Sequence, residues 1–298
     1  MKTLLSAVAA AALLLGAAGL HAQTLDKIRK DGAITIGHRD SSIPFSYLND
    51  KQEPIGYSMD ICLKIADAVK AELKLSNLAV KMAPVTSATR IPLMANGTID
   101  LECGSTTNNA DRQKQVAYAP TTFITANRFV TKKAANVANF DALKGKTIVS
   151  TSGSTNIKQA TELNAARNLG MNILAAKDHA EAFLMVETGR AVAFVMDDIL
   201  LYSLVATAKT PGDYVVSAEA LSTEPYGIML RRDDPSFKAL VDRTVAGLMQ
   251  SGEIEKIYAK WFLAPVPPKN VNLNLPISTA LKRTFAKPTD SPEPKVYE

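Results

Sequence analysis

The sequence of 298 residues is poor in the residue types that build metal sites and disulfide-rich scaffolds. It holds two cysteines, three histidines and one tryptophan, and they are scattered along the chain. This scatter provides no cluster of metal ligands, so we expect no metal site. The signatures GxGxxG, GxSxG, HExxH and the P-loop are absent as well. We therefore expect neither a cofactor nor one of the common catalytic centres.

Positive charge is also not concentrated anywhere in the chain. Lysine and arginine number 34 against 29 acidic residues, which gives a net charge of +5, and no run of five or six basic residues occurs. A nucleic-acid partner is therefore not expected. Apolar residues make up 47% of the chain and charged residues 21%, which is typical of globular proteins. The length suggests about two domains.

The N-terminus has the pattern of an export signal. Lys2 precedes the apolar stretch 3–20, and a small residue, Ala22, follows. This arrangement is typical of a signal peptide over residues 1–22, cleaved after Ala22. The alternative is an uncleaved membrane anchor, although the stretch is mostly Ala and Gly and hence weakly hydrophobic. No later run of 18 apolar residues occurs, so we expect the mature chain to be exported to the periplasm or beyond.

An exported chain can form disulfides, and its two cysteines are Cys62 and Cys103. Cys62 lies in a predicted helix and Cys103 at the end of a predicted strand. The sequence leaves two alternatives open, which are one disulfide or two buried thiols.

The hydrophobic pattern of the chain predicts two α/β units. In the first, strands at 33–37, 80–82 and 99–103 alternate with a helix whose face carries Ile61, Ile65, Val69 and Leu73, and with a helix at 88–95. The second unit repeats this rhythm. It has strands at 127–131, 147–150 and 191–196, a helix after the polar turn 151–155, and a helix at 180–188. Such alternation implies mostly parallel sheets covered by helices.

Two further helices follow Pro225, with apolar faces that include Leu240 and Ile257. From residue 264 onward the chain is rich in proline. We expect this C-terminal tail to be extended and to lie on the first unit.

Polar and charged residues follow nearly every predicted strand. Ligands of open α/β sheets bind beyond the carboxyl ends of the strands, and Arg39, Arg90 and Arg112 all follow strands of the first unit. Three guanidinium groups suit a ligand with two carboxylates, and Asp197 at the end of the 191–196 strand could hold an ammonium group. This combination predicts an acidic amino acid as ligand. The alternatives are solvated surface charges for the arginines and helix capping for Asp197 and the Ser/Thr clusters.

At these residues the sequence resembles the periplasmic glutamate/aspartate-binding proteins of polar amino-acid ABC transporters. The resemblance extends from about residue 24 to the proline-rich tail. It rests on the segments TLDKI (24–28), GHR (37–39), PFSY (44–47), ECGSTTNN (102–109), KDH (177–179), GRAVAF (189–194), MDD (196–198), WF (261–262) and PPKN (267–270).

The resemblance implies an α/β, two-lobed fold of the type II periplasmic-binding-protein kind, in which two sheets are joined by a two-strand hinge. Residues 24–125 plus 221–264 would form lobe one, and residues 126–220 would form lobe two. The tail, 265–298, would lie on lobe one.

The resemblance also implies roles for single residues. Arg112, helped by Thr107 and Thr155, would hold the α-carboxylate of the ligand, and Ser105 and Asp197 would hold its ammonium group. The pocket for the side-chain carboxylate would consist of Arg39, Ser87, Arg90 and His179. Two departures from the broader amino-acid-binding pattern occur: Ser58 stands where an acidic residue is usual, and the spacing from Gly104 to Arg112 is one residue longer.

We therefore predict a non-enzymatic, periplasmic and monomeric protein. It would capture L-glutamate or L-aspartate and deliver it to the membrane permease of an ABC transporter. One alternative is a dehydratase-like enzyme acting on a dicarboxylate such as prephenate or arogenate, with Glu102 or His179 as general acid. The other is a sensor that binds the same ligand but docks on a chemoreceptor.

Overall fold

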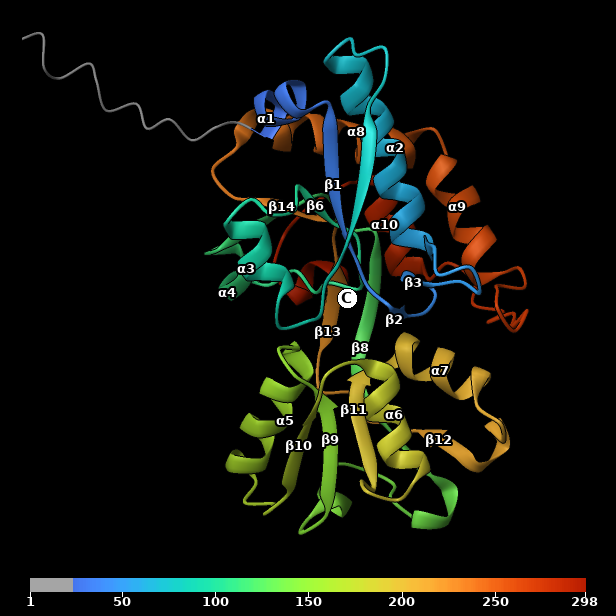
Figure 1. The fold of residues 1–298 in the computed structure, drawn as a ribbon. Coiled ribbons are helices and arrows are strands. Elements are labelled where there is room, and N and C mark those ends of the chain that lie inside the picture. The colour runs from blue at the N-terminus through green and yellow to red at the C-terminus, as the bar shows by residue number, and fades with distance from the viewer. Residues whose placement is uncertain (1–23) are drawn as a thin grey trace, which may run out of the picture.

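The computed structural model describes residues 24–298, which form two lobes that lie one above the other in Figure 1. The signal peptide predicted for residues 1–22 lies outside the described residues. Within 24–298, none of the helices combines the length and the apolar character that a membrane span needs.

The first lobe is built around a five-stranded sheet with the strand order β5-β1-β6-β14-β7. Strand β1 pairs in parallel with β5 and β6, whereas β14 is antiparallel to β6 and β7. The strands are β1 (Ala33–His38), β5 (Ala79–Pro84), β6 (Leu101–Glu102), β7 (Val116–Tyr118) and β14 (Met229–Arg231). A small antiparallel sheet of β2 (Ser41–Ser42), β3 (Ser46–Leu48) and β4 (Pro54–Ile55) lies beside it.

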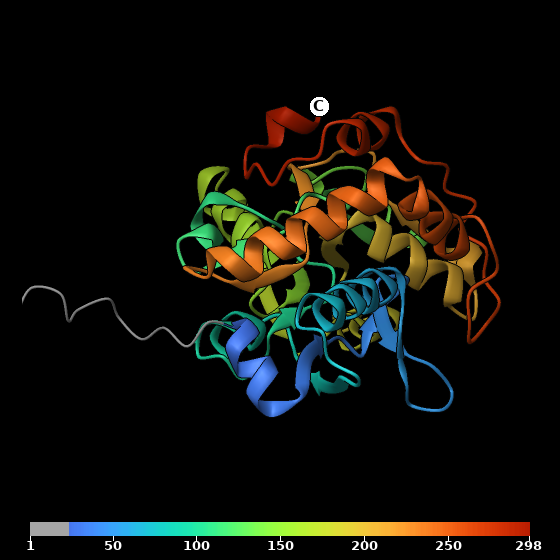
Figure 2. The same ribbon diagram turned by 90° about the horizontal axis from the view of Figure 1, so that it is seen from above.

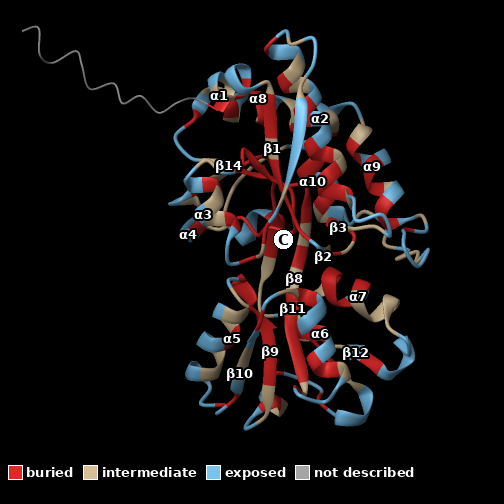
Figure 3. Ribbon diagram, in the orientation of Figure 1, coloured by how far each residue is buried: buried red, intermediate tan, exposed pale blue. Residues whose placement is uncertain are grey.

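Apolar helix faces cover this sheet. Ile61, Ile65 and Val69 are fully buried on one side of a helix, which confirms the four-residue pattern seen in the sequence. The helices are α1 (Thr24–Asp31), α2 (Tyr57–Glu72), α3 (Arg90–Ala95), α4 (Ala110–Gln113), α8 (Pro235–Gln250) and α9 (Glu253–Phe262). Figure 3 shows that the central strands of both lobes are buried, while the outer helix surfaces are exposed.

The second lobe has a sheet with the order β10-β9-β11-β8-β12. Its parallel strands are β9 (Thr147–Thr151), β10 (Asn172–Ala176) and β11 (Ala193–Asp197), and its antiparallel strands are β8 (Phe123–Lys132) and β12 (Tyr214–Val216). The helices are α5 (Thr155–Ala166), α6 (His179–Glu187) and α7 (Asp198–Thr207), with short 3-10 turns η1 (Lys133–Ala135), η2 (Asp141–Leu143) and η3 (Pro211–Asp213).

Two paired strands connect the lobes. Strand β8 begins between the lobes, where Phe123–Ala126 pairs antiparallel with β13 (Thr223–Tyr226), and then continues into the second sheet. Figure 1 shows both strands running from one lobe to the other. The predicted α/β fold with two sheets and a two-strand hinge is therefore confirmed.

The proline-rich tail is more ordered than the sequence predicted. It contains the helix α10 (Thr279–Ala286) and the 3-10 turn η4 (Pro294–Tyr297), so the expectation of an extended segment is wrong for these parts. The hydroxyl of Ser278 caps the helix by accepting a hydrogen bond from Leu281 N at 3.1 Å. Leu281 and Phe285 are buried, and Figure 2 shows this tail beside α8. Prolines flank the helix without interrupting it.

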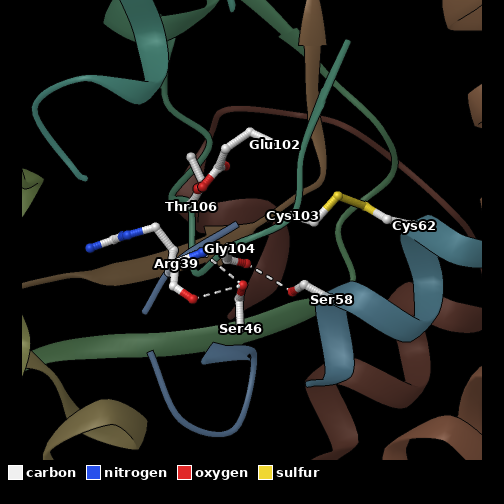
Figure 4. Close-up of a disulfide and its surroundings, with 8 residues drawn as sticks. All are labelled: Arg39, Ser46, Ser58, Cys62, Glu102, Cys103, Gly104 and Thr106. Carbon is white, nitrogen blue, oxygen red and sulfur yellow. Dashed lines mark hydrogen bonds between the residues drawn. A yellow bond between two sulfur atoms is a disulfide. The ribbon is translucent and has the colours of Figure 1, made fainter. Parts of the chain in front are cut away.

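The two cysteines form a disulfide, which decides between the two alternatives. The bridge joins Cys62 in α2 to Cys103, the residue after β6, and its Cα atoms are 6.3 Å apart. This distance is within the usual range for disulfides. The bridge fixes helix α2 to the start of the loop that runs from β6 toward the second lobe (Figure 4).

Candidate functional site

Loops and helix starts from both lobes enclose a small cavity of about 10 Å³, which is room for about one water molecule. It lies where the strand ends face the other lobe, as the sequence predicted. The first lobe contributes Ser87, Arg90, Ser105 and Thr107, and the second lobe contributes Ser154, Thr155, Asn156, His179, Met196, Asp197 and Leu200.

All nine residues that the sequence analysis selected are buried, and seven of them line this cavity. The other two are Arg39 and Arg112, which are not among the lining residues but stand close enough to influence them electrostatically. The charge of Arg39 lowers the pKa of His179, and the charge of Arg90 lowers the pKa of both Arg39 and Arg112. The structure therefore brings the predicted residues together.

The three arginines are buried. Arg39 follows β1 and is only 2% exposed, Arg90 is the first residue of α3, and Arg112 lies in α4. Burial, followed by the neighbouring charge of Arg90, lowers the pKa of Arg39 to about 10 and also lowers that of Arg112. Buried like charges are unfavourable unless an anion compensates them. The arrangement therefore favours an anionic ligand.

Several polar atoms of the site are buried without a hydrogen-bond partner in the described chain. They are Arg39 Nη1, Arg90 Nε, His179 Nε2 and Ser105 Oγ. Such atoms are rare in folded proteins because an unmet donor or acceptor is costly. Three of the four are nitrogens of basic side chains, so the missing hydrogen-bond partner is one that an anion can provide.

The histidine is prepared to act as a neutral donor. His179 is the first residue of α6, and its Nδ1 lies 2.8 Å from the hydroxyl of Thr151. Burial, Arg39 and Arg90 hold its pKa well below the usual value, so the ring is uncharged. In the tautomer in which the Thr151 hydroxyl donates to Nδ1, the proton resides on Nε2 and can be donated to an anion. His179 is 2% exposed, so its ring lies inside the protein and not on the surface.

Arg112 and Thr107 connect the two lobes. Arg112 Nη1 donates to the carbonyl oxygen of Thr107 at 2.8 Å, and Nη2 donates to that of Gly153 in the second lobe at 3.4 Å. The hydroxyls of Thr107 and Thr155 are 3.5 Å apart. Thr155 is the first residue of α5, so the N-terminus of this helix, where Ser154 caps the Ile157 N–H, lies at the same place. A carboxylate can thus be held from both lobes here.

The opposite charge is provided by the carboxylate of Asp197 at the end of β11. It accepts hydrogen bonds from Asn156 Nδ2 at 2.8 Å and from the hydroxyl of Tyr226. Burial, followed by the charge of Glu224, raises the pKa of Asp197 to about 7. An ammonium group of a ligand would offset this unfavourable burial.

Sequence reasoning missed three buried residues of this region, Asn156, Tyr226 and Glu224. Asn156 and Tyr226 hold Asp197, while Glu224 accepts hydrogen bonds from Thr155 Oγ1 at 3.4 Å and Gln159 Nε2 at 2.6 Å. Glu102 lies against Arg90. Tyr226 and Glu224 belong to the hinge strand β13, and only the second crossing of the chain brings them to the site. No group of three or more metal-ligating side chains occurs within residues 24–298.

Comparisons with known proteins agree with this geometry. Residues 34–264 match the family model of bacterial extracellular solute-binding proteins, family 3. An L-glutamate/L-aspartate-binding protein of Pseudomonas aeruginosa is 53% identical over 268 residues, covering 90% of this chain and 89% of the relative. A glutamate/aspartate import solute-binding protein of Escherichia coli is 49% identical, covering 90% and 88%.

A solved structure with the same fold is that of a mutant of ArgBP from T. maritima. It superposes with a TM-score of 0.71 at 24% sequence identity, covering 80% of this chain and 98% of that one. This likeness supports the fold, and the family match and the two relatives establish the membership. The chain belongs to the bacterial extracellular solute-binding proteins, family 3.

Proposed function

We propose that this protein captures L-glutamate or L-aspartate between its lobes and delivers it to the membrane permease of an ABC transporter. The proposal rests on three buried nitrogen atoms that have no hydrogen-bond partner, Arg39 Nη1, Arg90 Nε and His179 Nε2. Arg112 provides a second, separate guanidinium group. A ligand with a single carboxylate would need either the three nitrogens or Arg112, but not both. A ligand with two carboxylates uses both, and the names of the two relatives support the same ligand class.

The proposed roles follow the chemistry of each position. Arg112, Thr107 and Thr155 hold the α-carboxylate, since they lie where the two lobes touch. The side-chain carboxylate takes its hydrogen bonds from the unmet donors, with Ser87 beside them. Asp197 and Ser105 hold the ammonium group, for which Asp197 provides the negative charge and Ser105 Oγ an unused acceptor.

Ligand binding is proposed to stabilise the arrangement in which the lobes touch. Arg90 and Ser105 belong to the first lobe, whereas Thr155, His179 and Asp197 belong to the second. A ligand that contacts both sets binds the closed arrangement more tightly than an open one. We propose lobe boundaries of 24–125 plus 221–264 and 126–220, with residues 265–298 attached to lobe one.

We propose binding without catalysis. Among the residues lining the cavity, no Ser or Thr hydroxyl has a hydrogen bond to a histidine that could activate it. Of the two general acids considered for the dehydratase alternative, Glu102 does not line the cavity and pairs with Arg90, whereas His179 lines it. We also propose that the protein acts as a monomer in the periplasm. A chemoreceptor in place of the permease would leave the ligand unchanged.

A melting-temperature panel tests the proposal. The protein is unfolded and refolded to remove carried-over ligand, then mixed with L-Glu, L-Asp, L-Gln, L-Asn, L-Arg or prephenate. We expect L-Glu and L-Asp to raise the melting temperature as their concentration increases, and L-Arg to have no effect. A rise with prephenate alone, or with none of these compounds, would contradict the proposal.

Two arginine variants test the assigned roles. Arg112→Ala should abolish the shift for every amino acid, because it removes a charge-assisted pair to the α-carboxylate. Arg90→Ala should weaken L-Glu and L-Asp most. Arg167→Ala is the matched control, since Arg167 is an exposed arginine of the second lobe that pairs with Asp141. If Arg112→Ala responds to ligands like the control, the assignment of the α-carboxylate site is wrong.

A further inference from the structure

Glu102 is a buried carboxylate directly behind the arginines of the cavity, and the roles proposed above do not use it. It ends strand β6 and has no exposed surface. Glu102 forms an ion pair with Arg90, in which Arg90 Nη1 is 3.5 Å from Glu102 Oε1. Within residues 24–298, no other ion pair involves an arginine that lines the cavity. The position of Glu102 calls for an explanation because a buried carboxylate so close to an anion-binding site opposes the ligand.

A hydroxyl group links this carboxylate to the guanidinium group. Thr106 Oγ1 donates to Glu102 Oε2 and accepts a hydrogen bond from Arg90 Nη1, while the same Nη1 also donates to the carbonyl oxygen of Ser105 at 3.2 Å. Arg90 Nε remains buried without a partner, and Arg90 is one of the residues that line the cavity. Glu102 therefore helps to fix one end of the guanidinium group and leaves Nε for a ligand.

The protein holds Glu102 in place by several independent means. Glu102 lies in the centre of the sheet, paired with Gly37 on one side and Met229 on the other. The next residue forms the disulfide with Cys62, and the Ser58 hydroxyl donates to the carbonyl oxygen of Gly104 at 2.8 Å. Figure 4 shows the disulfide, Ser58 and Gly104 together with Glu102 and Arg39.

Gly104 allows the carboxylate and the stem of Arg39 to approach each other. A Cβ atom at position 104 would lie 2.3 Å from Glu102 Oε1 and 2.9 Å from Arg39 Cγ. Neither distance is compatible with a side chain at that position. The absence of a side chain at Gly104 thus belongs to the same arrangement as the disulfide and the Ser58 hydrogen bond.

The charge of Glu102 acts on all three arginines. It contacts Arg90 directly, and its field favours the charged forms of Arg39 and Arg112, whose pKa values burial lowers. When the cavity is empty, Glu102 therefore offsets part of the repulsion among the guanidinium groups. When a ligand carboxylate binds beside the same arginines, the two negative charges repel each other.

We propose that Glu102 is a built-in counter-ion that stabilises the empty site and limits how tightly the side-chain carboxylate of the ligand is held. This inference rests on the proposed function. Glu102 is a positioning residue, because it acts through Arg90 and does not line the cavity. A limited affinity is useful to a carrier that must release its ligand to a partner, since excessive stabilisation of the closed arrangement opposes release.

The test is Glu102→Gln, which keeps the size and the acceptor for Thr106 but removes the charge. The dissociation constants for L-Glu and L-Gln are measured by calorimetry at pH 8 on protein stripped of ligand. We expect L-Glu to bind about tenfold more tightly than to the wild type, with a much smaller change for L-Gln. The melting temperature of the ligand-free variant should fall, because the arginines lose their counter-ion.

Two further variants keep the test decisive. Glu102→Asp retains the charge but withdraws it from Arg90, so the ratio of L-Glu to L-Gln affinity should lie between those of the wild type and Glu102→Gln. This variant carries the test if Glu102→Gln does not fold. Asp100→Asn is the matched control, because Asp100 is equally buried and pairs with Lys27 away from the cavity. It should lower stability and leave the affinity ratio unchanged.

The outcomes separate this inference from the proposed function. If the wild type binds neither L-Glu nor L-Asp, the proposed function fails. If the wild type binds L-Glu but Glu102→Gln weakens both ligands equally, or changes the affinity ratio no more than Asp100→Asn does, the counter-ion role is wrong. A selective gain for L-Glu supports it.

Discussion

Replacing Asp197 by Asn should stabilise the ligand-free protein while removing its ability to bind ligand. The Asp197 carboxylate is 3% exposed, and burial together with Glu224 raises its pKa from 3.8 to about 7. The folded protein thus holds this proton more strongly than the unfolded chain does. Between pH 4 and pH 7 the unfolded state loses the proton first, so the ligand-free protein becomes less stable as the pH rises.

The size of the effect follows from this shift in pKa. A difference of about three pKa units corresponds to about 4 kcal/mol as an upper value for the penalty above pH 7. Asn is uncharged and similar in shape, and it can still accept from Asn156 or donate to Tyr226. The Asp197→Asn variant should therefore recover roughly half of the penalty, about 2 kcal/mol. For a protein of this size the melting temperature would rise by roughly 5 °C.

The assay is thermal unfolding of the stripped wild type and Asp197→Asn at pH 8 and at pH 4. At pH 8 the variant should melt at the higher temperature. At pH 4 the difference should shrink, since the folded state is then protonated at Asp197 and the unfolded chain, whose pKa is 3.8, is partly protonated as well. Addition of L-Glu should raise the melting temperature of the wild type but not that of Asp197→Asn. A variant that is less stable than the wild type at pH 8, or that retains the response to L-Glu, would refute this reasoning.

Three further predictions concern pH, the disulfide and the contact between the lobes. The affinity for L-Glu should fall as the pH drops below about 7, by at most about tenfold per pH unit, because Asp197 must be ionised to pair with an ammonium group. Calorimetry from pH 5 to 8 measures this, and an affinity independent of pH would contradict it. Replacing both Cys62 and Cys103 by Ala should lower the free energy of unfolding by about 4 kcal/mol, because the bridge closes a loop of 41 residues in the unfolded chain. Denaturant unfolding measures this loss, and a reductant should destabilise the wild type but not the variant. Gly153→Ala should weaken L-Glu binding, because a Cβ atom there would lie 2.6 Å from Ala88 Cα across the lobe contact. Gly170→Ala is its control, since Gly170 also has a positive φ but no neighbour within 4 Å, and equal binding by the two variants would argue against a steric role of the lobe contact.

Local patterns in the sequence were sufficient to predict much of the fold. Ile61, Ile65 and Val69 repeat at helical spacing and form the buried face of α2. The strand Ala191–Met196 was predicted from its apolar run, and the structure has β11 at Ala193–Asp197. These elements are determined by burial of their own side chains, so their pattern is visible in a short window. By contrast, β10 carries exposed and half-buried residues at the edge of its sheet, and it was missed.

The sequence predicted those site residues that directly follow a strand in the chain. Arg39, Arg90 and Asp197 could be selected because strand ends meet at one edge of an open sheet. Glu224 could not, because only the second hinge strand brings it to α5. The pairing of Glu102 with Arg90 was not predictable either, because it depends on side-chain geometry and on the space left by Gly104. The disulfide likewise depends on a three-dimensional distance between α2 and the end of β6 that spacing does not reveal.

The central claim is that the unmet donors of the cavity hold the side-chain carboxylate of an acidic amino acid. A crystal structure of the stripped protein soaked or grown with L-glutamate tests it most directly. The account predicts that this carboxylate lies within hydrogen-bond distance of Arg39 Nη1, Arg90 Nε and His179 Nε2, with the α-carboxylate on Arg112. A ligand whose side-chain carboxylate points to solvent, or whose α-carboxylate occupies the donors beside His179, would contradict it.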